Sequence, residues 1–152
     1  MAILPDDKDW TWVLDRVCPE CGYDATAVER DQLGTLTRRA AESWLQVLAR
    51  SDVRVGLMLS EQDPVFANWD QDATARERNY GSQDPARVGV ELANAAAELA
   101  GRFDGVHAGQ WERPGTRSNG SRFTVESIGR YMAHDILHHL WDVGCPPVTP
   151  YQ

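Results

Sequence analysis

The sequence lacks the features that mark membrane, secreted and nucleic-acid-binding proteins. Although 42% of its residues are hydrophobic, no apolar run approaches the roughly 18 residues that a membrane-spanning helix needs. Acidic residues outnumber basic ones by 23 to 15, for a formal net charge of −8, and such a surface repels the phosphates of nucleic acids. The stretch Met1–Pro5 has neither the basic start nor the apolar run of a signal peptide. We therefore expect a cytoplasmic protein with no membrane and no nucleic-acid partner.

Cysteine and histidine are also scarce. Three cysteines, an odd number, do not make the disulfide framework of a small secreted domain. A chain of 152 residues has the length of one domain with one hydrophobic core. We expect an irregular arm over residues 1–25, pinned to the body by Trp10 and Trp12, and a single helical domain over residues 26–152.

Apolar residues recur at spacings of three and four, the pattern of a helix that buries one face, over residues 26–50, 85–103 and 124–143. Each segment opens with a helix-start signal. Thr26 and Glu29 have the spacing of a capping box, Asp84 is an N-cap followed by proline, and Thr124 is a further N-cap. We expect these three helices to pack antiparallel to their neighbours.

The segment between the first two of these helices looks too short to be their partner. Only residues 51–60 are apolar enough for a helix. The polar residues 66–82 are expected to form a long ordered loop, and the glycine-rich residues 104–122 a connection anchored by Trp111. Three long helices and one truncated helix still predict an all-α fold, an antiparallel four-helix bundle with an irregular N-terminal arm.

The last helix carries a pair of candidate metal ligands. His134 and His138 are four residues apart, so their imidazoles leave the same helix face one turn from each other. That spacing can chelate a divalent metal. The alternative is that both histidines face solvent, because such a pair alone binds metal weakly. We predict that they point inward into a shared cavity, since Tyr131 and Trp141 flank them.

Other ionisable residues are weaker candidates. His139 lies nearer the apolar stripe and is read as a packing residue or a partner of the ligands, and His107 as an exposed residue. Asp70, Asp72 and Asp142 are candidate general bases or hydrogen-bond partners of metal ligands. The alternative is that they are solvated surface carboxylates, as acidic residues in an acidic protein usually are.

The segment Cys18-Pro19-Glu20-Cys21-Gly22 has the spacing of one half of a zinc knuckle, because two thiolates three residues apart bind one tetrahedral ion well. No second half follows. Since Cys145 is the only other thiol, a structural zinc would need a histidine or a carboxylate as a further ligand. The alternative is a reduced or loosely paired cysteine couple in a surface arm. A thioredoxin-like redox role is not expected, because no βαβ pattern surrounds the pair.

The pair His134-x3-His138 resembles the motif of the DinB-like proteins (the DinB/YfiT type), four-helix bundles whose last helix carries such a pair. A subgroup of these proteins is similar over nearly the whole chain, through the segments 18–22, 66–72 and 122–127. The resemblance implies a site of three histidines for zinc, nickel or a similar ion, with open positions for water or a small-molecule substrate. It relates the chain to S-transferases that use low-molecular-weight thiols such as mycothiol or bacillithiol, and to the maleylpyruvate isomerase N-terminal domain.

The sequence departs from that family at one ligand. In the family the first metal histidine lies on the second helix, whereas this chain has no histidine between Met1 and Val106. Either the ligand is lost, or a stretch that holds it is missing between Arg50 and Leu57. We favour the second explanation and predict a spatial break there.

Two functional hypotheses follow. The first is a metal-dependent thiol S-transferase. The second is a non-catalytic bundle, lacking one metal ligand, that binds or senses a small molecule and assembles as a homodimer. An open coordination position beside an intact ligand set would favour the first, and its absence the second.

Overall fold

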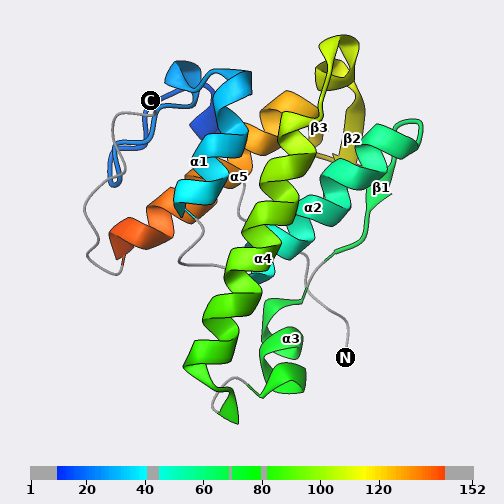
Figure 1. Ribbon diagram of the computed structural model, residues 1–152. Coiled ribbons are helices and arrows are strands. Elements are labelled where there is room, and N and C mark those ends of the chain that lie inside the picture. Colours follow the sequence, from blue (N-terminus) through cyan, green and yellow to red (C-terminus); the bar gives the residue numbers. More distant parts are fainter. Residues whose placement is uncertain (1–9, 41–44, 69, 80–81, 143–152) are drawn as a thin grey trace.

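The computed structural model describes residues 10–40, 45–68, 70–79 and 82–142, and its main elements are helices with a small sheet at one end (Figure 1). The α-helices are α1 (Leu33–Ala40), α2 (Leu45–Ser60), α3 (Gln71–Arg78), α4 (Pro85–Asp104) and α5 (Val125–Asp142). Short 3-10 helices are η1 (Thr11–Leu14), η2 (Ala25–Ala27), η3 (Arg30–Gln32) and η5 (Ala108–Glu112). None of the described helices combines the length and the apolar character of a membrane-spanning segment.

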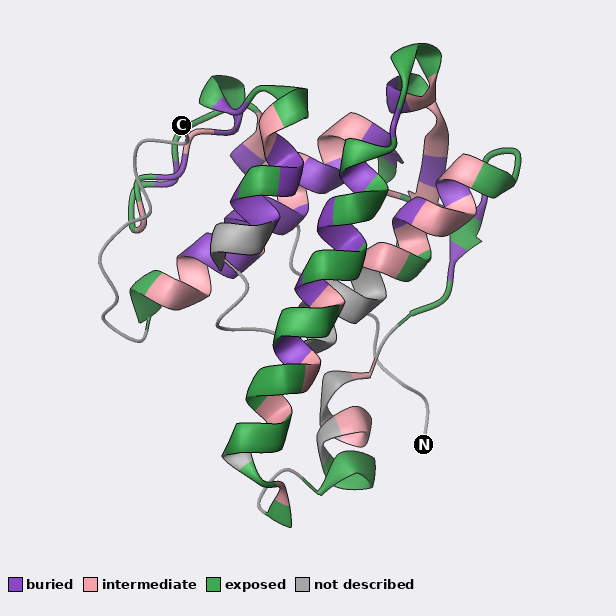
Figure 2. Cartoon of the chain, viewed as in Figure 1, coloured by how far each residue is buried: buried purple, intermediate pink, exposed green. Residues whose placement is uncertain are grey.

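Four of these helices form the bundle. Helices α4 and α5 each pack against both α1 and α2. All four contribute buried apolar side chains, among them Leu36, Val55, Leu99 and Ile136. The exposed positions of α4 face outward (Figure 2), whereas the exposed residues of α5 are confined to its C-terminal end. The all-α four-helix bundle expected from the sequence is confirmed.

The boundary between the first two helices differs from the prediction. Helix α1 ends at Ala40 and α2 begins at Leu45, so residues assigned to the end of one long helix belong to the second helix. The cause is that no glycine or proline occurs between Gly34 and Gly56 to mark the end of α1. Because α2 runs without interruption from Leu45 to Ser60, the predicted spatial break between Arg50 and Leu57 is wrong, and so is the missing stretch.

The predicted capping box at the start of the first helix is also displaced by three residues. The Thr26 N–H and hydroxyl both donate to Asp24 Oδ1, at 2.9 and 2.6 Å, so Thr26 lies inside the η2 turn. The capping box instead joins Glu29 and Gln32, with the Glu29 N–H donating to Gln32 Oε1 at 3.2 Å. It opens η3, which leads into α1.

The start signals of the two later helices act as predicted. The Asp84 carboxylate accepts from the Ala86 N–H at 3.0 Å at the start of α4, and Thr124 Oγ1 accepts from the Ser127 N–H at 3.1 Å at the start of α5. Both bonds satisfy backbone donors that a helix end leaves free. The predicted end of the last helix, at residue 143, lies outside the described residues.

The two segments expected to be irregular contain regular structure. Strand β2 (Pro114–Arg117) pairs in parallel with β1 (Val65–Phe66) and antiparallel with β3 (Arg122–Thr124). The predicted loop over residues 66–82 holds α3, whose N-cap Asp70 accepts from the Ala73 N–H at 2.8 Å. Strands of two to four residues show no alternation that a sequence pattern could reveal, and α3 is too polar to show a helical period. The expected anchor Trp111 is buried and stacks on Phe103.

At two helical glycines, side chains of neighbouring helices lie directly against the helix backbone. A Cβ built on Gly129 of α5 would lie 2.8 Å from Leu33 Cδ1 of α1 and 3.0 Å from Phe103 Cε1 of α4. A Cβ on Gly34 would meet the Asp104 carboxylate of α4. Glycine therefore sets the spacing at the end of the bundle where α5 begins.

The first prediction compares two helical glycines. Gly129→Ala should lower the free energy of unfolding by about 1–3 kcal/mol, because the added methyl overpacks the contact with Leu33 and Phe103. Gly89→Ala is the matched control, since nothing lies within 4 Å of its Cβ, and it should be neutral or stabilise α4 by up to about 1 kcal/mol. Urea unfolding of the two variants measures both effects. Equal stabilities would contradict the packing described above.

Candidate metal centre

The segment Cys18–Tyr23 folds into a tight turn that holds its two thiols close together. The Gly22 N–H donates to the Cys18 carbonyl at 2.9 Å, and the Cys18 N–H donates to the Tyr23 carbonyl at 2.8 Å. Gly22 has a φ of +73°, a left-handed conformation in which a Cβ would be strained. This turn gives the C-x2-C pair the arrangement of one half of a zinc knuckle.

His134 and His138 lie on successive turns of α5, with ring centroids 5.2 Å apart. His134 is 4% exposed, and the His138 side chain is 13% exposed. Both imidazoles are therefore turned inward, as predicted, while the shared cavity predicted for them stays a prediction. Their role as metal ligands is a separate prediction, which the following contacts support.

The turn of the arm and the histidines of α5 meet at one point. One ligand atom from each of Cys18, Cys21, His134 and His138 lies within 4.8 Å of the other three, and Cys18 Sγ is 3.7 Å from His138 Nδ1. In a tetrahedral zinc site, bond lengths of about 2.3 Å to sulfur and about 2.1 Å to nitrogen put those two atoms about 3.6 Å apart. The Cys18–His138 pair therefore has the spacing that one ion requires, and the other donors lie near enough for small side-chain shifts to complete the set.

Aromatic rings enclose the two imidazoles: Trp10, Trp12, Tyr23 and Trp141. The Trp10 centroid is 5.9 Å from the centroids of both His134 and His138. The Tyr23 hydroxyl donates to the Arg130 carbonyl of α5 at 2.8 Å. The arm therefore covers much of the histidine face of α5 with aromatic rings.

Burial sets the protonation state of His134. Desolvation, followed by the nearby charges of His138 and His139, lowers the pKa of His134 from 6.5 to about 4. The imidazole is consequently neutral at neutral pH, which is the form that binds metals. Its Nε2 is buried with no hydrogen-bond partner in the described part of the chain. A buried polar atom without a partner costs free energy, and a bound metal ion would provide the partner.

The thiol of Cys21 also responds to its surroundings. Burial raises the pKa of the Cys21 thiol from 9.0 to about 11; Cys18 raises it as well, while hydrogen bonding from the Tyr23 N–H opposes the rise. A thiol that coordinates a metal ion is deprotonated outright. Cys21 should therefore be a thiol without a metal and a thiolate with one, and metal binding should release its proton.

Carboxylates lie on the outer side of His138. Its Nε2 is 3.4 Å from Glu20 Oε2 and 3.7 Å from Asp142 Oδ1. Asp142 Oδ2 is also 2.9 Å from Nδ1 of His139. Asp142 thus lies beside a candidate ligand, as expected for a hydrogen-bond partner of a metal ligand. The His139 side chain is 40% exposed and contacts this carboxylate; it is not one of the four donors.

The remaining candidates lie elsewhere. The Asp70 side chain caps α3 and takes no part in the cluster. The side chain of Asp72 lies outside the described part of the structure. His107 is exposed, as expected, and its backbone N–H donates to Gln110 Oε1 at 2.9 Å at the start of η5.

Sequence reasoning found both halves of the cluster but did not join them. It sought the missing ligand on the second helix, whereas the donors that converge with the histidine pair are Cys18 and Cys21 of the arm. The available signal was that a C-x2-C pair and a His-x3-His pair, each incomplete, add up to four donors. Their separation of more than 110 residues gave no local reason to pair them.

Comparisons with known proteins support the fold. No family model and no curated protein matches the sequence. Among solved structures, the chain is similar to YfiT from Bacillus subtilis, described as "a probable metal-dependent hydrolase with an unusual four-helix bundle topology". The TM-score is 0.50 at 17% identity, over 88% of this chain and 74% of that one. At this identity the likeness shows a shared fold, which agrees with the bundle fold that the DinB-like resemblance implies. It does not show that the chain is related to the thiol S-transferases or to the maleylpyruvate isomerase N-terminal domain.

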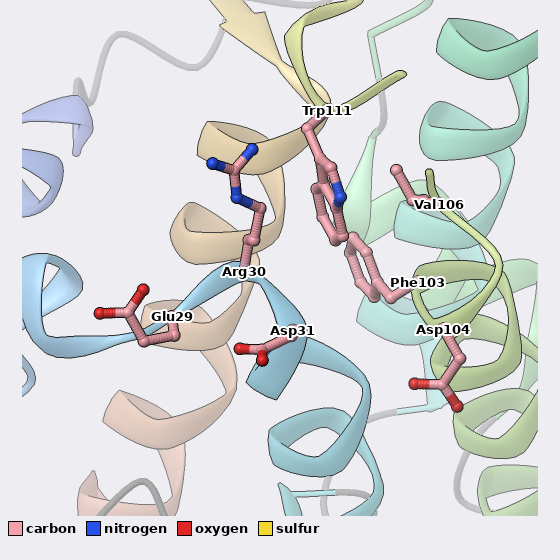
Figure 3. A pocket seen from close by; sticks show the side chains of 7 residues that line it. All are labelled: Glu29, Arg30, Asp31, Phe103, Asp104, Val106 and Trp111. Atoms are coloured by element: carbon pink, nitrogen blue, oxygen red, sulfur yellow. The ribbon is translucent and has the colours of Figure 1, made fainter. Parts of the chain in front are cut away.

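A separate cavity of about 470 Å³ lies between η3, the end of α4 and η5 (Figure 3). Phe103 and Trp111 stack along one side of it. Asp31 of η3 and Asp104 of α4 also line it. None of its lining residues belongs to the four-donor cluster. A small molecule bound here would not touch the candidate metal ligands.

The second prediction concerns pH and the metal-free protein. The pKa of His134 is lower in the folded chain, about 4 against 6.5, so protons bind preferentially to the unfolded chain. The free energy of unfolding should fall by about 3 kcal/mol as the pH drops from 6.5 to 4, and change little through this group above pH 6.5.

Urea unfolding across this pH range, in the presence of a chelator, measures the effect. His134→Leu should remove most of the pH dependence, whereas His107→Ala, at an exposed histidine, should keep it. If His134→Leu and the parent protein lose stability in parallel, the burial of a neutral His134 is wrong.

Proposed function

We propose that this protein is a zinc-binding helical bundle whose ion is held by Cys18, Cys21, His134 and His138. The observation that carries the proposal is the convergence of four donor atoms within 4.8 Å of one another from two distant segments. The unpartnered, buried Nε2 of His134 supports it. This extends the histidine pair predicted from the sequence by two thiolates.

The chemistry of the donors favours zinc over nickel. Two thiolates and two imidazoles in a compact cluster fit the tetrahedral S2N2 set that is typical of zinc. Two thiolates also neutralise the ion's double charge, which matters because the cluster is largely buried. Copper would compete on affinity alone, so the identity of the metal is part of the test.

The division of the donors indicates what the ion does. The arm supplies only the two sulfurs, and α5 supplies only the two nitrogens. An ion at this point therefore links the arm to the bundle, in the manner of structural zinc sites that contribute directly to folding. It also satisfies polar atoms that the surrounding aromatic rings shield from water.

This arrangement favours the non-catalytic hypothesis over the enzyme. A thiol S-transferase of the kind implied by the resemblance, or a hydrolase such as YfiT is described to be, needs an open coordination position for its thiol, water or substrate. Four protein donors leave none. In this proposal the arm supplies two ligands in place of the histidine that the family has on its second helix. A small molecule would then bind at a separate site, such as the cavity beside Trp111.

The third prediction tests the ligand set. Protein purified and dialysed should contain one zinc per chain by elemental analysis, and Cys18→Ser, Cys21→Ser, His134→Ala and His138→Ala should each weaken zinc binding strongly. His107→Ala is the matched histidine control and should keep one zinc per chain. Full retention of zinc by either cysteine variant would contradict the proposed set.

The fourth prediction separates a closed site from an open one. Cobalt(II) in place of zinc should give the intense visible absorption of a tetrahedral ion together with thiolate-to-cobalt charge transfer. Adding a low-molecular-weight thiol should leave this spectrum unchanged, because no position is free to accept the sulfur. A new charge-transfer band on adding the thiol would favour the S-transferase instead.

A further inference from the structure

The two histidines of the cluster have different surroundings. His134 is enclosed by aromatic rings, and its Nε2 has no hydrogen-bond partner in the described part of the chain. His138 presents Nδ1 to Cys18 Sγ at 3.7 Å and Nε2 to the carboxylates of Glu20 and Asp142 at 3.4 and 3.7 Å. His138 therefore has acidic groups at the ring nitrogen opposite the one that faces Cys18.

We propose that Glu20 and Asp142 together form a carboxylate clamp that positions His138 to bind the metal through Nδ1. The inference rests on the proposed zinc site and adds two positioning residues to it. Two negative groups beside Nε2 favour the tautomer that carries its proton there, which leaves the lone pair on Nδ1. A ring whose outer N–H faces a carboxylate is also a stronger donor to the metal.

The clamp joins the same two elements as the ligands do. Glu20 lies between Cys18 and Cys21 in the turn of the arm, so the turn delivers a carboxylate as well as two thiols. Asp142 lies one helical turn after His138 on α5. The His138 ring is thus approached from the arm and from its own helix, which fixes its orientation more firmly than one contact would.

A second histidine holds the Asp142 carboxylate in place. Nδ1 of His139 is 2.9 Å from Asp142 Oδ2, while Nε2 of His139 is 3.8 Å from Asp135 Oδ1. Asp142 therefore uses one oxygen toward His139 and the other toward His138. Asp135 contacts His139 from the same helix, one turn before it, which makes it a matched control for the loss of a neighbouring carboxylate.

Ordinary surface ion pairing is the alternative reading of these contacts. The Glu20 and Asp142 side chains are 55% and 41% exposed, and exposed pairs contribute little to stability. If the contacts are ordinary surface pairs, removing the carboxylates should change neither the affinity for zinc nor the nitrogen of His138 that binds it. If they form a clamp, removing them should change both, with little effect on the stability of the metal-free chain.

The fifth prediction uses Glu20→Gln, Asp142→Asn and the double variant, with Asp135→Asn as the matched control. Competition with a chromophoric chelator measures zinc affinity. Each single variant should bind zinc about tenfold more weakly and the double variant up to about 100-fold, whereas Asp135→Asn should bind as the parent does. Urea unfolding of the metal-free proteins should give the same stability for all of them.

Nitrogen NMR of histidine-labelled, zinc-loaded protein gives the second readout. In the parent, His138 should be ligated at Nδ1 and protonated at Nε2. Ligation through Nε2, or parent-like zinc affinity in the double variant, would overturn the clamp while leaving the zinc site intact. Failure of the parent itself to bind zinc would instead overturn the proposed function.

Discussion

The meeting of the Cys18–Gly22 turn with one face of α5 is the contact on which the rest of this end of the molecule depends. Both partners carry polar groups that are costly to bury, namely two thiols and two imidazoles, and each set is incomplete without the other. A single tetrahedral ion would satisfy all four donors. The arm can then lie on the bundle without leaving a ligand atom such as His134 Nε2 unpaired in an apolar environment.

The aromatic residues around this contact gain a common explanation. An isolated α5 would have apolar residues on one face and histidines with Tyr131 and Trp141 on the other, a combination that suits neither core nor solvent. The arm resolves the conflict, because Trp10 and Tyr23 lie against the imidazoles and cover them. The low dielectric of this setting keeps His134 neutral and would strengthen contacts between a bound metal and the thiolates, so packing would support coordination.

Local signals account for what the sequence predicted correctly. Asp84 and Thr124 cap α4 and α5 because cap chemistry involves only neighbouring residues, and the period of each helix reports its buried face. The end of α1 was missed because no breaker residue follows Gly34 within 20 residues, and the short strands because they are too short for a pattern. The candidate site was predicted in halves: spacing identifies each pair of donors, but only the fold brings Cys18 and Cys21 to His134 and His138.

X-ray absorption at the zinc edge tests the central claim most directly, since it reports the atoms bound to the ion. The account predicts a first shell of two sulfurs at about 2.3 Å and two imidazole nitrogens at about 2.0–2.1 Å. The imidazole rings should be visible in the outer-shell scattering. A first shell of nitrogen and oxygen alone, with no sulfur, would contradict the account, because it would mean that the arm does not bind the ion held by α5.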